Sequence, residues 1–214
     1  MSARAEILGR IGAALGDVPR PAPSPFPSPA EWTYGAPATG IEDVAGLFVE
    51  RVEDYRAVVD RVAAADLPAA VGRALGPARA VVVPPGLEPE WLSTVVDVEV
   101  VVDDGTLSAA ELDATDAVVT AAAVGIAVTG TIVLDHGADQ GRRALSLVPD
   151  LHVCVVRLDQ LVGDVPEAVA RLSEAVASGR PLTWISGPSA TSDIELERVE
   201  GVHGPRNLHV LLVD

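Results

Sequence analysis

The stretch richest in reactive side chains is ISGPSATSDIE, residues 185–195. A hydrolase elbow of the form G-x-S-x-G would need a second glycine, but position 191 holds Thr. The residue types instead predict a strand, a tight turn and a helix start capped by Ser189 or Thr191. Such a helix end can bind an anion, although capping alone also explains the pattern. The candidates here are Ser186, Gly187 and Ser189 for ligand binding and Asp193 for catalysis.

A second polar group lies in VTGTIV, residues 128–133. Thr129, Gly130 and Thr131 could offer hydroxyl groups and closely spaced backbone N–H groups to an anion. The alternative is a glycine kink between β-branched strand residues. We take these three residues as ligand-binding candidates.

Paired arginines lie in HGADQGRRALSLVP, residues 136–149. Arginine suits the recognition of carboxylate and phosphate groups because its planar guanidinium donates two parallel hydrogen bonds. In so acidic a chain, Arg142 and Arg143 could equally pair with Asp135 or Asp139. Arg142 is the ligand-binding candidate of this segment.

The last candidates lie in GVHGPRNLHV, residues 201–210. His203 stands in a glycine-flanked turn and could act as an acid, a base or a hydrogen-bond donor; a surface turn is the alternative. Arg206 could help to hold an anion. His152 and His209 alternate with apolar strand residues, so we expect them to be structural.

Composition excludes several classes of function. The chain carries 31 acidic and 15 basic residues, a formal net charge of −16, which repels nucleic acid and anionic membranes. Every basic residue is arginine, so a Walker-type phosphate loop and a pyridoxal Schiff base, which need lysine, are excluded. No G-x-G-x-x-G motif supports a dinucleotide site. The sequence thus predicts no cofactor and no partner nucleic acid.

The single cysteine limits the redox chemistry of the chain. Cys154 lies in the apolar run LHVCVV and is expected to be a buried, inert thiol. One thiol makes no intramolecular disulfide, cysteine zinc site or self-contained iron–sulfur cluster. We expect a cytoplasmic protein without a resident metal.

The first 40 residues differ from the rest of the chain. Residues 2–15 suit a short amphipathic helix, and residues 16–40 contain seven prolines and suit an extended linker. We therefore expect an N-terminal helix and arm over 1–40 and an α/β domain over 41–214. An apolar-faced helix beyond such an arm could dock on a partner or form a homo-oligomer.

The body is expected to alternate helices with valine-rich strands. Residues 41–65 show apolar residues at helical spacing, and later strands include residues 79–83, 152–157 and 208–213. Continuous apolar strands indicate a mostly parallel sheet covered by helices on both faces, with binding sites beyond the carboxyl ends of the strands. The uncharged run 117–134 is better explained by two buried strand pieces, broken near one of its glycines, than by a membrane span.

Four segments, in this order, resemble the LUD domain, the family of lactate utilisation protein C. They are GIAVTGTIVLD, GRRALSLVPDLHVCVV, ISGPSATSDIE and GVHGPRNLHVLLVD, and the resemblance covers roughly residues 40–214. It implies a fold similar to that of the sugar-phosphate isomerase and CoA-transferase group. The family usually has an acidic residue where this chain has Val128, and often a basic or polar one where it has Ala190.

The resemblance implies a subunit of bacterial L-lactate oxidation to pyruvate, working with iron–sulfur partner proteins and binding a small carboxylate. Two alternatives stay open. One is a free-standing enzyme of the isomerase and acyl-transferase fold that acts on an anionic metabolite. The other is a non-catalytic assembly subunit. Val128 cannot supply the glutamate nucleophile that CoA transferases use.

Overall fold

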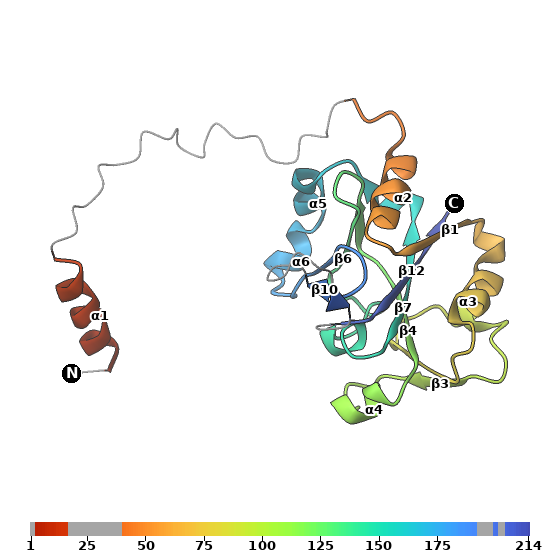
Figure 1. The fold of residues 1–214 in the computed structure, drawn as a ribbon, viewed down its shortest axis with the longest axis horizontal. Helices are drawn as coiled ribbons and strands as arrows, with labels where there is room; N and C mark the ends of the chain where they lie inside the picture. The colour runs from red at the N-terminus through yellow and green to blue at the C-terminus, as the bar shows by residue number, and fades with distance from the viewer. Residues whose placement is uncertain (1–2, 17–39, 192–198, 201–203) are drawn as a thin grey trace. The chain divides into compact units, whose positions relative to one another are not determined.

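The computed structural model describes residues 3–16, 40–191, 199–200 and 204–214. The chain divides into two compact units, Met1–Thr33 and Tyr34–Asp214. In the first unit, α1 (Ala3–Ala14) lies where the sequence predicts a short helix, and none of its residues is buried (Figure 1). The proline-rich segment 17–39 lies outside the described residues.

A six-stranded parallel sheet forms the centre of the second unit and confirms the predicted α/β class. Its strand order is β1-β12-β7-β4-β2-β3. Valine and leucine dominate β7, β4 and β12, and most of their side chains are buried, as expected for a parallel sheet covered on both faces. The strands are β1 (Val58–Val62), β2 (Ala80–Val83), β3 (Glu99–Val102), β4 (Ala117–Ala121), β7 (Leu151–Arg157) and β12 (Asn207–Val213).

A second, four-stranded sheet of mixed direction was not foreseen from the sequence. Its order is β8-β5-β6-β9, and only β5 and β8 run parallel. The uncharged run 117–134 folds into β4 and the β5–β6 hairpin, three strands where two were expected. Among the described residues, no helix is long and apolar enough to cross a membrane. The strands are β5 (Val124–Ile126), β6 (Thr131–Leu134), β8 (Leu161–Val162) and β9 (Thr183–Ile185).

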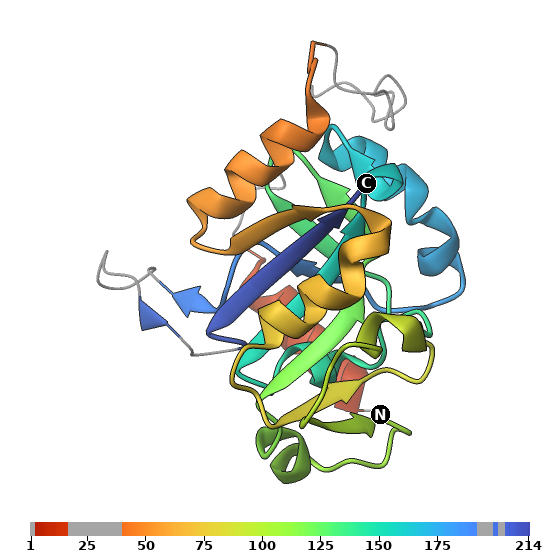
Figure 2. The same cartoon turned by 90° about the vertical axis from the view of Figure 1, so that its right-hand side faces the viewer.

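The two faces of the large sheet have different covers. On one face, α3 (Leu67–Leu75) and the 3-10 turn η3 (Pro89–Leu92) pack over valines of β2, β4 and β7. Figure 2 shows α3 in front of this face. On the other face, Phe48 and Val52 of α2 (Val44–Asp54) and Ile132 of β6 pack against β7 and β12. A helix and a second sheet therefore share the cover of that face.

The remaining short elements surround these layers. The helix α4 (Ala109–Asp113) contributes Leu112 to a small cluster with Val82, Val118 and Leu145. The outer face of the small sheet is covered by α5 (Val165–Arg171), followed by α6 (Ser173–Ala177). The other elements are the 3-10 turns η2 (Ala64–Asp66), η4 (Arg143–Ser146) and η5 (Leu158–Gln160) and the two-residue strands β10 (Ala190–Thr191) and β11 (Val199–Glu200).

The helix predicted over 41–65 was too long. The observed α2 ends at Asp54, Arg56 adopts a φ of 67°, and the chain then enters β1. Val58 and Val59 are β-branched and pair with His209 and Val210 of β12. Burial against a neighbouring strand therefore overrides a helical spacing that continues past the true end of the helix.

The turn after β9 also differs from its prediction. Ala190 and Thr191 form β10, which pairs antiparallel with Val199–Glu200 of β11. A helix capped by Ser189 is thereby excluded, because the residues that would follow the cap are extended. Residues 192–198, where the predicted helix would continue, lie outside the described residues.

Candidate functional site

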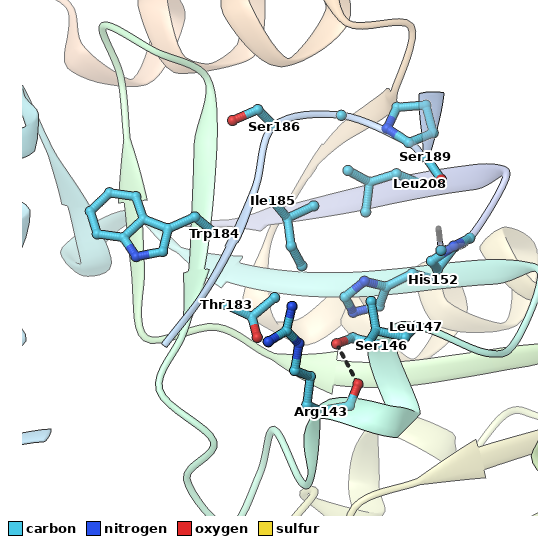
Figure 3. Close-up of a pocket in the computed structure, with 14 residues that line it drawn as sticks. Arg143, Ser146, Leu147, His152, Thr183, Trp184, Ile185, Ser186, Ser189 and Leu208 are labelled. Carbon is cyan, nitrogen blue, oxygen red and sulfur yellow. Dashed lines mark hydrogen bonds between the residues drawn. The ribbon is translucent and has the colours of Figure 1, made fainter. Parts of the chain in front are cut away.

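A cavity of about 310 Å³ opens beside the turn that follows β9 (Figure 3). His152 and Leu208, the second residues of β7 and β12, lie on its inner side. The large sheet therefore contributes the amino ends of its strands, not the carboxyl ends that were expected. Its lining residues are Arg143, Ser146, Leu147, His152, Thr183–Pro188, Ser189, Gly204, Pro205 and Leu208.

The turn residues predicted from ISGPS all reach this cavity. Ser186, Gly187 and Ser189 line it. The Ser189 N–H donates to the carbonyl of Pro205 at 2.8 Å, which joins the turn to the segment before β12. The hydroxyl groups of Ser186 and Thr131 are hydrogen-bonded at 2.8 Å. Two motifs that lie 55 residues apart in the chain thus meet at one wall.

The VTGT segment supports this wall from behind and does not line the cavity. Thr131 is buried, and its hydroxyl is shared between Ser186 and the Thr129 carbonyl. The Gly130 N–H donates to the Ala127 carbonyl and is not free to bind an anion. Within the part of the chain that the structure describes, the buried Oγ1 of Thr129 has no hydrogen-bond partner. Thr131 therefore holds Ser186 from behind, and none of these three candidates lines the cavity.

Two glycines of these motifs allow α2 to approach closely. A Cβ on Gly130 would lie 2.6 Å from the backbone carbon of Arg51, and one on Gly187 would lie 2.4 Å from the Cβ of Tyr55. Both glycines have positive φ, 56° and 83°. The carboxyl end of α2 therefore rests on the two turns that shape the site.

The two neighbouring arginines have opposite roles. Arg142 donates to both carboxylate oxygens of buried Asp103 at 2.8 and 3.0 Å, and to the carbonyl of Leu107 at 2.6 Å. These bonds raise the pKa of Arg142 and occupy its Nε and Nη2 donors. Arg143 lines the cavity, and none of the described residues forms an ion pair or a side-chain hydrogen bond with its guanidinium. Arg143 therefore replaces Arg142 as the candidate.

Arg206 also falls outside the cavity. It pairs with Asp150 at the surface, and both side chains are about half exposed or more. A solvated pair of this kind forms locally in an acidic chain, which was the alternative for every arginine. His203 and Asp193, the catalytic candidates, lie outside the described residues.

His152, which the sequence indicated to be structural, borders the cavity although only 1% of it is exposed to solvent. Its Nε2 is 2.8 Å from the hydroxyl of Thr120 on β4. Burial lowers the pKa of His152 to about 4, because the charged imidazolium is poorly solvated there. At neutral pH the cavity thus has a neutral imidazole on its inner side. The sequence signal that could have indicated this position is a polar residue among the apolar residues of a strand.

His136 fixes another polar group of the lining. Its Nδ1 lies 2.8 Å from the Gly141 carbonyl, which can only accept, so this nitrogen donates. The neutral ring then accepts at Nε2 from the Thr183 hydroxyl, also at 2.8 Å. Thr183 lines the cavity, and its hydroxyl orientation is therefore set by His136.

Acid should destabilise the fold through His152. Its pKa is lowered from 6.5 in the unfolded chain to about 4 in the fold, so the unfolded state binds the proton first as the pH falls. Full stability is present above pH 6.5 and is lost between pH 6.5 and 4. We expect about 2 kcal/mol of loss between pH 7 and pH 5 from this group. The measurement is urea unfolding at both pH values.

His152→Phe serves as the matched variant, because it removes the titrating group and retains a ring. Its loss of stability over the same pH range should be smaller by that amount. Equal losses in the two proteins would show that other groups, such as the carboxylates, account for the whole acid effect.

The described residues contain no cluster of three or more His, Cys, Asp or Glu side chains able to hold a metal ion. Burial raises the pKa of the Cys154 thiol to about 12, so the thiol stays protonated. The cavity offers groups for recognition: one guanidinium without an ion-pair partner among the described residues, several hydroxyl groups, a neutral imidazole and apolar walls. This set suits a small, singly charged molecule.

The model of the LUD domain matches residues 96–213, which include every residue of the cavity lining. A protein of Deinococcus radiodurans called lactate utilization protein C is 52% identical over 211 residues, which are 99% of this chain and 95% of that protein. The protein of the same name from Bacillus licheniformis is 32% identical over 45% of this chain and 41% of its own length.

A solved structure is similar in both sequence and fold. It is the crystal structure of a DUF162 family protein from Deinococcus radiodurans, 47% identical to this chain, with a TM-score of 0.71. The match covers 83% of this chain and all of that one.

Proposed function

This chain belongs to the LUD domain family, and we propose on that premise that it is a cytoplasmic component of L-lactate utilisation. The 52% identical relative, matched over nearly its whole length, supports the role in lactate utilisation. We further propose that the chain acts with iron–sulfur partner proteins in the oxidation of L-lactate to pyruvate. Its own single buried thiol could not hold a cluster.

The cavity beside the β9 turn is the proposed site of a small anionic ligand. The observation that carries this part is Arg143, whose guanidinium borders the cavity with no protein partner among the described residues. In a chain with twice as many acidic as basic residues, an arginine without a carboxylate partner is available to an incoming anion. The Ser186 hydroxyl group, which also lines the cavity, adds a polar contact beside it.

The experiment deletes the gene from its bacterium and tests growth on L-lactate as the only carbon source. Growth should fail and should return with the wild-type gene. The tagged chain should also co-purify with cysteine-rich iron–sulfur proteins. Normal growth of the deletion strain on L-lactate would contradict the proposal.

Complementation by two arginine variants separates ligand binding from simple assembly. Arg143→Gln should restore less than about a tenth of the growth-supporting activity, because a charge-assisted bond to the anion is lost. Arg206→Gln, which alters a solvated pair outside the cavity, should complement fully. Full complementation by both variants would instead favour an assembly subunit, and turnover by the isolated chain would favour a free-standing enzyme.

A further inference from the structure

The large sheet has two edge strands, β1 and β3, and their sequences differ. Among the described residues, β3 pairs with β2 alone (Figure 1). The β1 strand carries Asp60 and Arg61, and charged side chains of this kind protect an edge from pairing with a further strand. In β3, every residue after Glu99 is valine, and residues 93–105 contain no proline. The β3 edge therefore lacks the protection that the β1 edge has.

The hydrogen bonds of β3 show which of its backbone groups face away from the sheet. The Glu99 N–H donates to the Arg79 carbonyl at 2.7 Å, and the Asp103 N–H donates to a carbonyl of β2 at 2.9 Å. Because backbone groups alternate in direction along a strand, the N–H and C=O groups of Val100 and Val102 point outward. Outward groups of this kind are a template on which another strand can pair.

Apolar side chains accompany these outward backbone groups. Val100 is 42% exposed and Val102 is 55% exposed, and Val96, just before the strand, is 75% exposed. Val100 and Val102 pair with Val81 and Val83 of β2, which pack under α3, so the exposed valines lie on the same face of the sheet as that helix. The cover of this face thus ends before the edge. A strand added beside β3 would bury these valines and pair the outward backbone groups together.

The charges around β3 select one register in which two copies of the strand can pair. In an antiparallel pair with its two-fold axis at Val100, Glu99 lies opposite the partner's Val101. Moving the axis by one residue in either direction places Glu99 opposite a carboxylate of the other copy, either that of its own counterpart or that of Asp103. Like charges directly opposite are destabilising. Asp97 has a φ of 57° and so leaves the extended conformation before this register begins.

We propose that β3 is the contact surface between two copies of this chain, with a two-fold axis at Val100 that joins the two six-stranded sheets. Val98 of each copy then lies opposite the partner's Val102, so valine meets valine across the contact, as a self-complementary surface requires. One strand pair buries less area than a standard interface, and two copies with a net charge of −16 repel each other. The dimer is therefore weak and reversible, with a Kd of about 20 μM.

Sedimentation velocity of the full chain over a range of about 1 to 200 μM tests the dimer. The mass should rise with concentration from 22.0 kDa to twice that value. About 0.5 M salt should lower the Kd at least about threefold, because it screens the repulsion between two acidic copies. A chain that stays monomeric up to about 200 μM would overturn the inference. A dimer that salt dissociates would also contradict it, because valines and backbone groups would not then hold the contact.

Charge variants assign the contact to β3. Val100→Glu should raise the Kd at least about tenfold, because two carboxylates then lie opposite each other at the axis. Val58→Glu is the matched control: it adds the same charge to the other edge strand, at a side chain that is 54% exposed, and should change the Kd by less than about twofold. Val102→Glu repeats the test if Val100→Glu fails to fold. A dimer that tolerates both β3 variants would refute the assignment.

A disulfide tests the register. Residues opposite each other in a hydrogen-bonded antiparallel pair have Cα atoms about 5.5 Å apart, a distance that a disulfide spans. Val100→Cys should therefore form a covalent dimer under mild oxidation, and the native Cys154 is buried and does not compete. Val96→Cys is more exposed, but the register places it opposite the partner's Asp104, so this variant should stay monomeric on a non-reducing gel. Equal cross-linking of the two variants would contradict the axis at Val100.

Discussion

Replacing Gly130 by alanine is expected to lower the free energy of unfolding by about 4 kcal/mol, at the upper end of single substitutions. Two effects add at this position. A φ of 56° strains any residue with a Cβ, and the new methyl group would lie 2.6 Å from the backbone carbon and 2.7 Å from the carbonyl oxygen of Arg51. Backbone atoms of a packed helix cannot move aside cheaply, so α2 would have to shift on the sheet.

Gly179→Ala is the matched control for this substitution. Its φ is 75°, but a Cβ there meets nothing within 4 Å, so only the backbone strain of about 1 kcal/mol remains. Chemical denaturation of both variants at pH 7 measures the two losses. Equal losses in the two variants would show that the close packing of α2 on the VTGT turn is not the reason for glycine at position 130.

The same pair of variants tests how the fold supports the site. Gly130 precedes Thr131, whose hydroxyl holds that of Ser186 at 2.8 Å. A shift of α2 and this turn should therefore reduce ligand affinity in the Gly130→Ala protein that remains folded. Gly179, which follows α6 and does not line the cavity, should leave affinity unchanged.

Local sequence signals were sufficient for elements with clear ends. Pro68 lies in the first turn of α3 and Gly76 ends it, and Asp164 caps α5 by accepting the Glu167 N–H at 3.0 Å. These signals work because caps and breakers act within one turn of chain. The β1 strand was missed, because its pairing with β12, some 150 residues later in the chain, has no local signature.

The sequence was sufficient to predict which turn residues reach the candidate site, but not which charged residue does. Ser186 and Ser189 belong to a turn that any strand end would expose, and they do reach the cavity. Choosing between Arg142 and Arg143 required knowing that Asp103 follows a strand on the same side of the sheet. His152 was assigned to the core correctly, but only the fold shows that a cavity opens beside its ring.

Exchanging Arg142 for glutamine is expected to cost about 3 kcal/mol of stability, whereas the same exchange at Arg143 should cost less than about 0.5 kcal/mol. Removing the Arg142 guanidinium leaves the Asp103 carboxylate, of which 3% is exposed, without its counter-charge and the Leu107 carbonyl without its donor. Arg143 is exposed, and among the described residues nothing depends on its charge. Urea unfolding compares the two variants.

For ligand affinity we expect the opposite ranking, in which Arg143→Gln has the larger effect. Arg142 acts on the site only by holding the start of η4, from which Arg143 reaches the cavity. Each folded molecule of the Arg142→Gln protein should bind lactate within about threefold of wild type, while Arg143→Gln loses at least about tenfold. Adding Asp103→Asn to Arg142→Gln should recover about 1 kcal/mol, since the amide carries no buried charge. If the double variant were no more stable than Arg142→Gln, an unpaired Asp103 carboxylate would not be the cause of the loss.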